Sequence, residues 1–184
     1  STKQFLQVYS VCSTVFSQVD IITDGKAPTF DASHSLDLTH KDYKKVNTIK
    51  NDYQGLVIPD ALGTFLQSFC KFKSIKLKYF KSDIEPVCMI GRGAAALLST
   101  KPDIDQEWIF ARYSLTGPSN IDDFNDGVYG KYPSIEDFCF ENLGNYTCSR
   151  KNALHIIVDD NVVTGQNKTS TLIAIQTFIL LCNR

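Results

Sequence analysis

The chain has few of the features that mark metal-binding, disulfide-rich or membrane proteins. It holds 3 histidines and 6 cysteines with no paired CxxC spacing, so neither a zinc motif nor a redox dithiol is predicted. We expect reduced, mostly buried thiols. No apolar run reaches the roughly 18 to 20 residues that span a bilayer, and the chain opens on Ser1 without a signal-peptide pattern. These absences predict a soluble, cytoplasmic protein that uses no metal or other cofactor.

An excess of charge of one sign is also lacking. The formal net charge is −1 and the pI is near 6.3, which argues against a global attraction to nucleic acid or to anionic membranes. One local exception is the run in which Lys71, Lys73 and Lys76 alternate with aromatic and aliphatic residues. The solvated face of an amphipathic helix is the simpler interpretation, and a weak RNA contact is the alternative.

What the chain does contain is enough apolar sequence, 43%, for one substantial core, so we expect a single domain over 1–184. Apolar residues at helical spacing, and short apolar runs closed by Gly, Pro or Asp, divide it into elements. Helices are expected over 1–17, 41–52, 62–81, 94–98 and 170–182. Strands are expected over 19–23, 55–59, 86–90, 108–110, 113–115, 135–140, 155–159 and 161–164.

This order predicts an α/β fold, with a mostly parallel sheet, helices on both faces and ligand chemistry at the carboxyl ends of the strands. A doubly wound domain normally begins with a central strand, whereas this chain begins with a helix. We therefore expect the first strand to be missing from the given chain. The segment over 39–53 is also short for a helix with its connections.

Two segments carry a specific resemblance. One is the run Trp108 to Ser119, which reads WIFARYSLTGPS, and the other is 155–182, with Val163-Thr164-Gly165-Gln166-Asn167 followed by Ser170-Thr171. Together they resemble the PfpI and class I glutamine amidotransferase-like superfamily, over nearly the whole chain. The resemblance implies a flavodoxin-like three-layer sandwich.

The same resemblance locates the catalytic positions. Catalytic members hold a nucleophilic cysteine in a strained turn between a strand and a helix, called the elbow, where the helix N-terminus lowers the thiol pKa. With Gly93 set on the invariant elbow glycine, Gly91 takes the place of the nucleophile. The superfamily histidine precedes a proline, and that place falls on Gly117, before Pro118. Both catalytic side chains are therefore expected to be absent.

A third departure lies after the preceding strand. Active members place a Gly-Gly pair after the strand's proline as oxyanion donors, whereas Pro59 is followed here by Asp60-Ala61-Leu62-Gly63. The resemblance thus implies a pseudoenzyme with no catalytic residues, in which Gly91, Arg92 and Gly93 form a vestigial elbow.

Two further hypotheses concern the same region. Arg92, with Gly117 and Ser119, forms a candidate anion pocket for a carboxylate or phosphate, and a surface arginine at a turn is the alternative. A relocated nucleophile at Cys88, Ser114 or Ser119 would instead make the protein a PfpI-type hydrolase, glyoxalase or deglycase. For Cys88 a buried structural role is favoured. His34, His40 and His155 are too far apart in sequence to suggest a metal site.

Close relatives within the superfamily belong to the FERRY complex, a Rab effector on early endosomes that links messenger RNA to endosomal transport. The resemblance therefore implies a homo-oligomeric scaffold, expected to be a tetramer. It would act in the cytoplasm, peripheral to early endosomes, with the other FERRY subunits and indirectly a Rab GTPase as partners.

Overall fold

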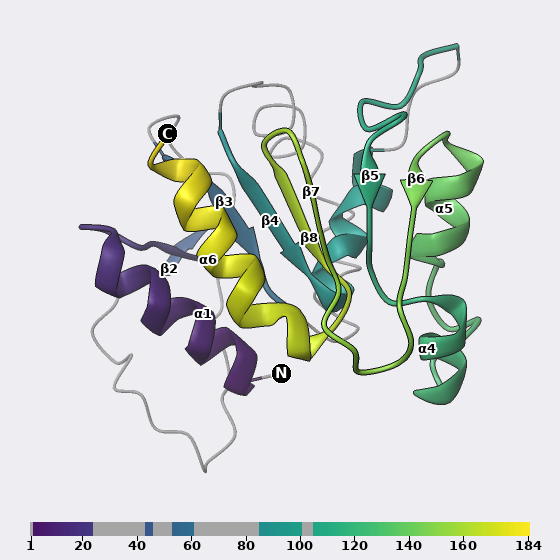
Figure 1. Ribbon diagram of the computed structural model, residues 1–184, viewed down its shortest axis with the longest axis horizontal. Helices are drawn as coiled ribbons and strands as arrows, with labels where there is room; N and C mark the ends of the chain where they lie inside the picture. Colours follow the sequence, from purple (N-terminus) through teal and green to yellow (C-terminus); the bar gives the residue numbers. More distant parts are fainter. Residues whose placement is uncertain (1, 24–42, 46–52, 61–84, 101–104) are drawn as a thin grey trace.

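A computed structural model describes residues 2–23, 43–45, 53–60, 85–100 and 105–184. Its largest sheet has four strands in the order β3, β4, β8, β7 (Figure 1). Strands β3 (Leu56–Ile58), β4 (Val87–Ile90) and β8 (Val162–Gly165) are parallel, and β7 (Ile156–Asp159) is antiparallel to β8. All four residues of β4 and of β8 are buried, as expected for central strands of a sheet covered on both faces.

Two smaller pairs of parallel strands flank this sheet. On one side β1 (Ile21–Thr23) pairs with β2 (Tyr43–Lys45), and on the other β5 (Ser114–Leu115) pairs with β6 (Asn145–Tyr146). The backbone N–H of Ser114 donates to the Asp159 carboxylate (2.6 Å), and that of Thr116 donates to Thr164 Oγ1 (3.0 Å). These bonds tie the end of β5 to the main sheet.

One face of the sheet is covered by α1 (Thr2–Val15) and α6 (Thr171–Cys182), which lie side by side in Figure 1. Alternate residues of β4 face opposite sides of the sheet, so Cys88 and Ile90 point toward these helices. They form a core with residues of α1, β8 and α6, which are Val8, Cys12, Val163, Ala174, Ile175, Phe178 and Leu181.

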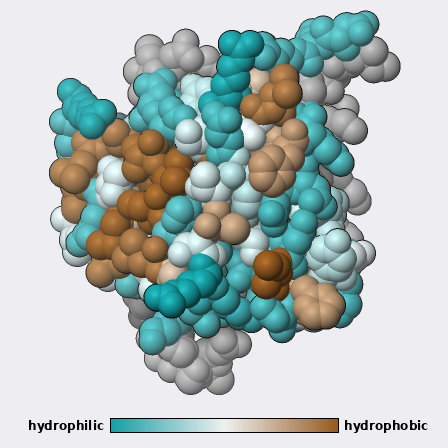
Figure 2. All heavy atoms as spheres, turned by 45° about the vertical axis from the view of Figure 1, so that its right-hand side comes forward, coloured by the Kyte–Doolittle hydropathy of each residue, from teal (hydrophilic) through white to brown (hydrophobic). Residues whose placement is uncertain are grey.

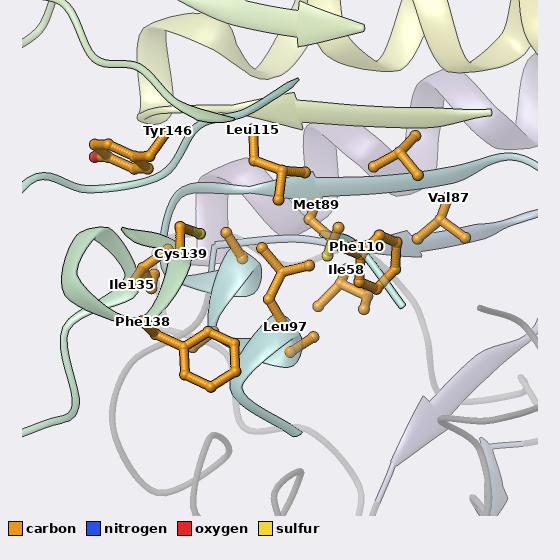
Figure 3. Close-up of a cluster of buried hydrophobic side chains, with 14 of the residues drawn as sticks. Ile58, Val87, Met89, Leu97, Phe110, Leu115, Ile135, Phe138, Cys139 and Tyr146 are labelled. Carbon is orange, nitrogen blue, oxygen red and sulfur yellow. The ribbon is translucent and has the colours of Figure 1, made fainter. Parts of the chain in front are cut away.

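The opposite face is covered by η2, a 3-10 helix over Gly91–Thr100, and by α5 (Ile135–Glu141). Val87 and Met89 of β4 point this way, and Figure 3 shows them with Leu97, Leu115 and Phe138 in a second core. Two short helices complete the described chain, namely α4 (Asn120–Asn125) and η3 (Lys168–Ser170). Helices on both faces of a mainly parallel sheet confirm the predicted α/β sandwich.

Three element predictions were wrong. A helix was expected over 41–52, but this range contains β2, because pairing with β1 outweighs the local helical preference. The strand expected over 108–110 is a turn in which Trp108 and Phe110 are buried, and Arg112 that follows has a φ of +70°. The strand expected over 135–140 is α5. The helix predicted over 62–81 lies outside the described residues.

The reason for α5 can be seen in its spacing. Ile135, Phe138 and Cys139 are buried at i, i+3 and i+4, which is one face of a helix. Ser134 caps the N-terminus, since its side chain accepts from the backbone N–H of Asp137 at 3.0 Å. The helical period of this run therefore outweighs its strand-like composition.

The surface is apolar in a few places. Figure 2 shows apolar side chains gathered over α6, where Leu172, Ile173 and Leu180 are among the exposed hydrophobic residues. Ile121 and Phe124 of α4 form a smaller exposed pair. Among the described residues, no helix combines the length and apolar character needed to cross a bilayer.

Candidate functional site

β4 ends directly before the residues that were predicted to form the elbow. β4 stops at Ile90, and Gly91 begins η2 with a φ of +53°, a left-handed conformation that favours glycine. The helix therefore starts without the separate turn expected over 91–93. Gly91 has no side chain, so the position that the superfamily resemblance assigns to the nucleophile presents only backbone here.

Gly93 fixes how closely η2 approaches β3. A Cβ at Gly93 would lie 2.3 Å from the carbonyl oxygen of Ile58 and 2.8 Å from that of Pro59. Both contacts are with backbone atoms, which have little room to shift. Only glycine fits at this position, and the elbow is therefore held tightly against the end of the neighbouring strand.

Asp60 occupies the space beside Gly91. The register of β3 against β4 aligns Ile58 with Met89. Two residues beyond each of these, Asp60 lies beside Gly91. A Cβ at Gly91 would lie 2.6 Å from Asp60 Oδ1, and the same oxygen accepts the backbone N–H of Arg92 at 3.0 Å. A carboxylate of the chain itself therefore lies where a nucleophile's side chain would begin.

The Arg92 side chain turns into the protein. The side chain is 9% exposed, and its guanidinium pairs with Asp123 through Nη1 at 2.6 Å and with Asp126 through Nη2 at 3.5 Å. Lys151 extends this network by pairing with Asp126 at 2.7 Å. The anion partners of Arg92 in this structure are thus two aspartates that follow each other along α4 and its C-terminal cap.

The two carboxylates differ in electrostatics. Burial raises the pKa of Asp123, although the charge and hydrogen bond of Arg92 act in the opposite direction. The hydrogen bond and charge of Lys151, with a smaller contribution from Arg92, lower the pKa of the half-exposed Asp126. The buried pair is therefore the costly one to disrupt, and an external anion at Arg92 would have to displace these carboxylates.

The other two predicted pocket residues are structural in their contacts. A Cβ at Gly117 would lie 3.1 Å from Ile135 and 3.2 Å from Ala94, and the carbonyl oxygen of Gly117 accepts the Tyr146 hydroxyl at 2.8 Å. Ser119 is buried and caps α4 in a reciprocal capping box with Asp122. The structure brings Gly117 near Ala94 of η2, but it employs Ser119 as a helix cap.

The alternative nucleophiles are also engaged in packing. Cys88 is fully buried in the core beneath α1 and α6, where burial raises its pKa, as its predicted structural role requires. Ser114 lies in β5, the first strand that follows η2 along the chain. His155 is near Thr147, with Nε2 and Oγ1 3.1 Å apart. His34, His40, Lys71, Lys73 and Lys76 lie outside the described residues.

One buried polar network was missed by the sequence reasoning. Gln166 is fully buried, and its amide nitrogen donates to Asp122 Oδ2 (2.8 Å) and to the Ser149 carbonyl (2.9 Å) while its oxygen accepts the Ser149 N–H (2.8 Å). It thereby ties α4 and the loop around Ser149 to the end of β8. The Thr-Gly-Gln-Asn motif, which contains Gln166, was the sequence signal from which this network could have been found.

In the part of the chain that the structure describes, no group of three or more His, Cys, Asp or Glu side chains is arranged to hold a metal ion. A cavity of about 390 Å³ lies between the end of α1 and β1. It is lined in part by Tyr9, Phe16 and Asp20. The elbow region is therefore defined by its close-packed backbone and its internal ion pairs.

Comparison with solved structures places the fold. One crystal structure superimposes with a TM-score of 0.81 at 17% identity, over 99% of this chain and 88% of the other. A ThiJ/PfpI domain protein from Brachyspira murdochii superimposes with a TM-score of 0.64 at 12% identity, over 98% and 88% of the two chains. The chain therefore has the flavodoxin-like α/β fold of these proteins.

Curated sequences give the particular family. Glutamine amidotransferase-like class 1 domain-containing protein 1 of Danio rerio is 35% identical over 196 residues, spanning all of this chain and 91% of that protein. The Homo sapiens protein of the same name is 32% identical, with 99% and 88% covered. No family model matches the chain. The chain belongs to the family of glutamine amidotransferase-like class 1 domain-containing protein 1.

Proposed function

We propose that this chain is a non-catalytic member of its family and acts as an oligomeric scaffold or interaction subunit. The observation that carries the proposal is the elbow, where Gly91 supplies no side chain and the Asp60 carboxylate stands 2.6 Å from the place of its missing Cβ. A nucleophile and its activating base are the minimum for covalent catalysis at such a turn. Gly117 adds nothing that can serve as the base.

The assembly proposed for this scaffold is the one that the resemblance of the sequence implies. We expect the chain to act in the cytoplasm, peripheral to early endosomes, as a subunit of the FERRY complex that links a Rab GTPase and messenger RNA. Within it we propose a homo-oligomer, expected to be a tetramer. A fold that keeps its internal ion pairs and helix caps but not its catalytic groups is compatible with such a role.

Affinity purification of the tagged chain from cell extract tests the scaffold role. We expect FERRY subunits and a Rab GTPase to be recovered with it, and messenger RNA to be recovered through them. A triple variant, Lys71→Glu, Lys73→Glu and Lys76→Glu, separates direct from indirect RNA retention at low salt. Recovery of the chain alone would contradict the scaffold role, and unchanged RNA retention in the triple variant would remove the direct contact.

The second candidate is a PfpI-type hydrolase, glyoxalase or deglycase with a relocated nucleophile. Ser114 is the partly accessible candidate, since Cys88 is fully buried and Ser119 caps a helix. Assays with methylglyoxal and with amide and ester substrates distinguish the two functions. Turnover that is lost in Ser114→Ala, Ser119→Ala or Cys88→Ala would favour this candidate over the scaffold.

A further inference from the structure

The N-terminus of η2 is a place where an acidic partner is expected but is not supplied locally. The first turn of η2 contains no acidic residue, and Ile90, which precedes it, has no hydrogen-bonding side chain. The first backbone N–H groups of a helix lack partners within the helix and carry a partial positive charge. An anion or an acidic side chain from elsewhere stabilises such an end.

Asp60 supplies that partner from the neighbouring strand. Its Oδ1 accepts the N–H of Arg92 at 3.0 Å, and this N–H belongs to the residue that directly follows Gly91. In a covalent catalyst built on this turn, the N–H following the nucleophile is a donor for the developing oxyanion. The Asp60 carboxylate thus already accepts the N–H that would otherwise donate to an oxygen of the substrate.

The absence of a side chain at Gly91 makes this contact feasible. With any other residue at position 91, a Cβ would come within 2.6 Å of Oδ1 and 2.9 Å of Cγ of Asp60. The register of β3 and β4 places the two residues near each other, because Asp60 and Gly91 each lie two residues beyond the aligned pair Ile58 and Met89. The glycine and the aspartate are therefore complementary to each other.

We propose that the Asp60 carboxylate is the resident ligand of the elbow, which closes the donor site from within and excludes both substrate anions and a thiolate. This inference rests on the proposed non-catalytic function and deepens it. In this proposal the two features depend on each other, because Asp60 can approach the Arg92 N–H only where position 91 has no side chain. Restoring a cysteine at position 91 would then be insufficient to restore a reactive thiolate.

Two engineered chains test this proposal, Gly91→Cys alone and Gly91→Cys combined with Asp60→Asn. Asparagine keeps the shape of the side chain and a carbonyl acceptor but removes the charge. The introduced thiol is followed by its rate of iodoacetamide labelling against pH, with peptide mapping, and Cys148 in the same chain is the internal reference. Circular dichroism establishes that both variants are folded.

With Asp60 present, we expect the pKa of the introduced thiol to lie above the ordinary value of about 8.5, because a carboxylate beside it disfavours the thiolate. Without the carboxylate charge, the helix N-terminus should lower that pKa and raise the labelling rate at pH 7 about tenfold. Equal pKa values in the two variants would overturn the proposal. The proposed non-catalytic function would not be contradicted by that result, because the turnover assays test it separately.

A second measurement avoids any change at Gly91. Amide hydrogen exchange at Arg92, observed by NMR, should be slow in the natural chain and at least tenfold faster in Asp60→Ala, because the N–H then loses its acceptor. The Arg112 N–H, which donates to the Leu143 carbonyl at 2.7 Å, is the control and should be unchanged. Unchanged exchange at Arg92 in Asp60→Ala would overturn the proposal as well.

Discussion

At the scale of single residues, Arg92 links the elbow to α4 through a buried ion pair. The side chains of Arg92 and Asp123 are each 9% exposed, and Nη1 lies 2.6 Å from Oδ1. Removing one partner of a buried ion pair leaves the other charge without compensation, which costs about 3 to 5 kcal/mol. We expect Arg92→Ala to lower the free energy of unfolding by that amount in urea denaturation.

Asp126 provides the matched control for this prediction. It pairs with the same guanidinium and with Lys151, but 49% of its side chain is exposed. Water screens such a pair, so Asp126→Asn should cost less than about 1 kcal/mol. Because its pKa is lowered, the stabilisation from Asp126 is present above the ordinary value of 3.8 and is lost as pH falls through the lowered one. A larger cost for Asp126→Asn than for Arg92→Ala would contradict this assignment.

The described cysteines should differ widely in reactivity. Cys12, Cys88 and Cys139 are buried, and burial raises the pKa of Cys12 to about 11 and that of Cys139 to about 12. Cys148 is exposed. The thiolate is the reactive form, so iodoacetamide at pH 7.5 should label Cys148 first and Cys12 more slowly by a factor of at least 100. Rapid labelling of Cys88, seen by peptide mapping, would contradict the structural role assigned to it.

At the scale of elements, the contact between β3 and η2 determines the shape of the elbow. Gly93→Ala places a Cβ 2.3 Å from the backbone oxygen of Ile58, and we expect a loss of about 3 kcal/mol or more in unfolding free energy. Gly127→Ala is the control. It has a φ of +67° but no atom within 4 Å, so only the backbone strain of about 1 to 2 kcal/mol applies. Equal losses in the two variants would show that β3 and η2 are not tightly packed.

The parts of the fold that the sequence predicts well are those with strong local signals. The strands β3, β4 and β8 are short apolar runs bounded by Gly, Pro or Asp, and α1 and α6 have regular helical spacing. Local signals fail for β2, whose strand form depends on β1, and for the turn at Trp108, which is stabilised by a bond from its indole N–H to Thr100 at 2.8 Å. β2 depends on pairing with a separate segment, and the turn depends on a side-chain contact with a residue eight positions earlier, so neither is evident from its own residues.

The candidate site divides in the same way. Gly91 and Gly93 could be located from their motif, since a strand, two glycines and a helix are local features. The role of Asp60 could not, because it depends on the register of β3 against β4. The partners of Arg92 could not be predicted either, because Asp123 is 31 residues away in the sequence and α4 was not among the predicted helices.

At the scale of the whole molecule, the proposed scaffold role requires association. A single chain has a mass of 20.6 kDa, and we expect size-exclusion chromatography with light scattering to give about four times that mass. The net charge of −1 places little long-range repulsion between copies. A mass that stays at that of one chain across a hundredfold range of concentration would contradict the oligomeric part of the proposal.

The central claim is that a molecule with this fold and this elbow performs no covalent chemistry. The measurement that tests it most directly is the rate at which the purified chain converts methylglyoxal to lactate, compared with buffer and with heat-denatured protein. We predict a rate equal to that of buffer. A rate above it that saturates with substrate, and that falls when Cys88 or Ser114 is changed to alanine, would contradict the claim.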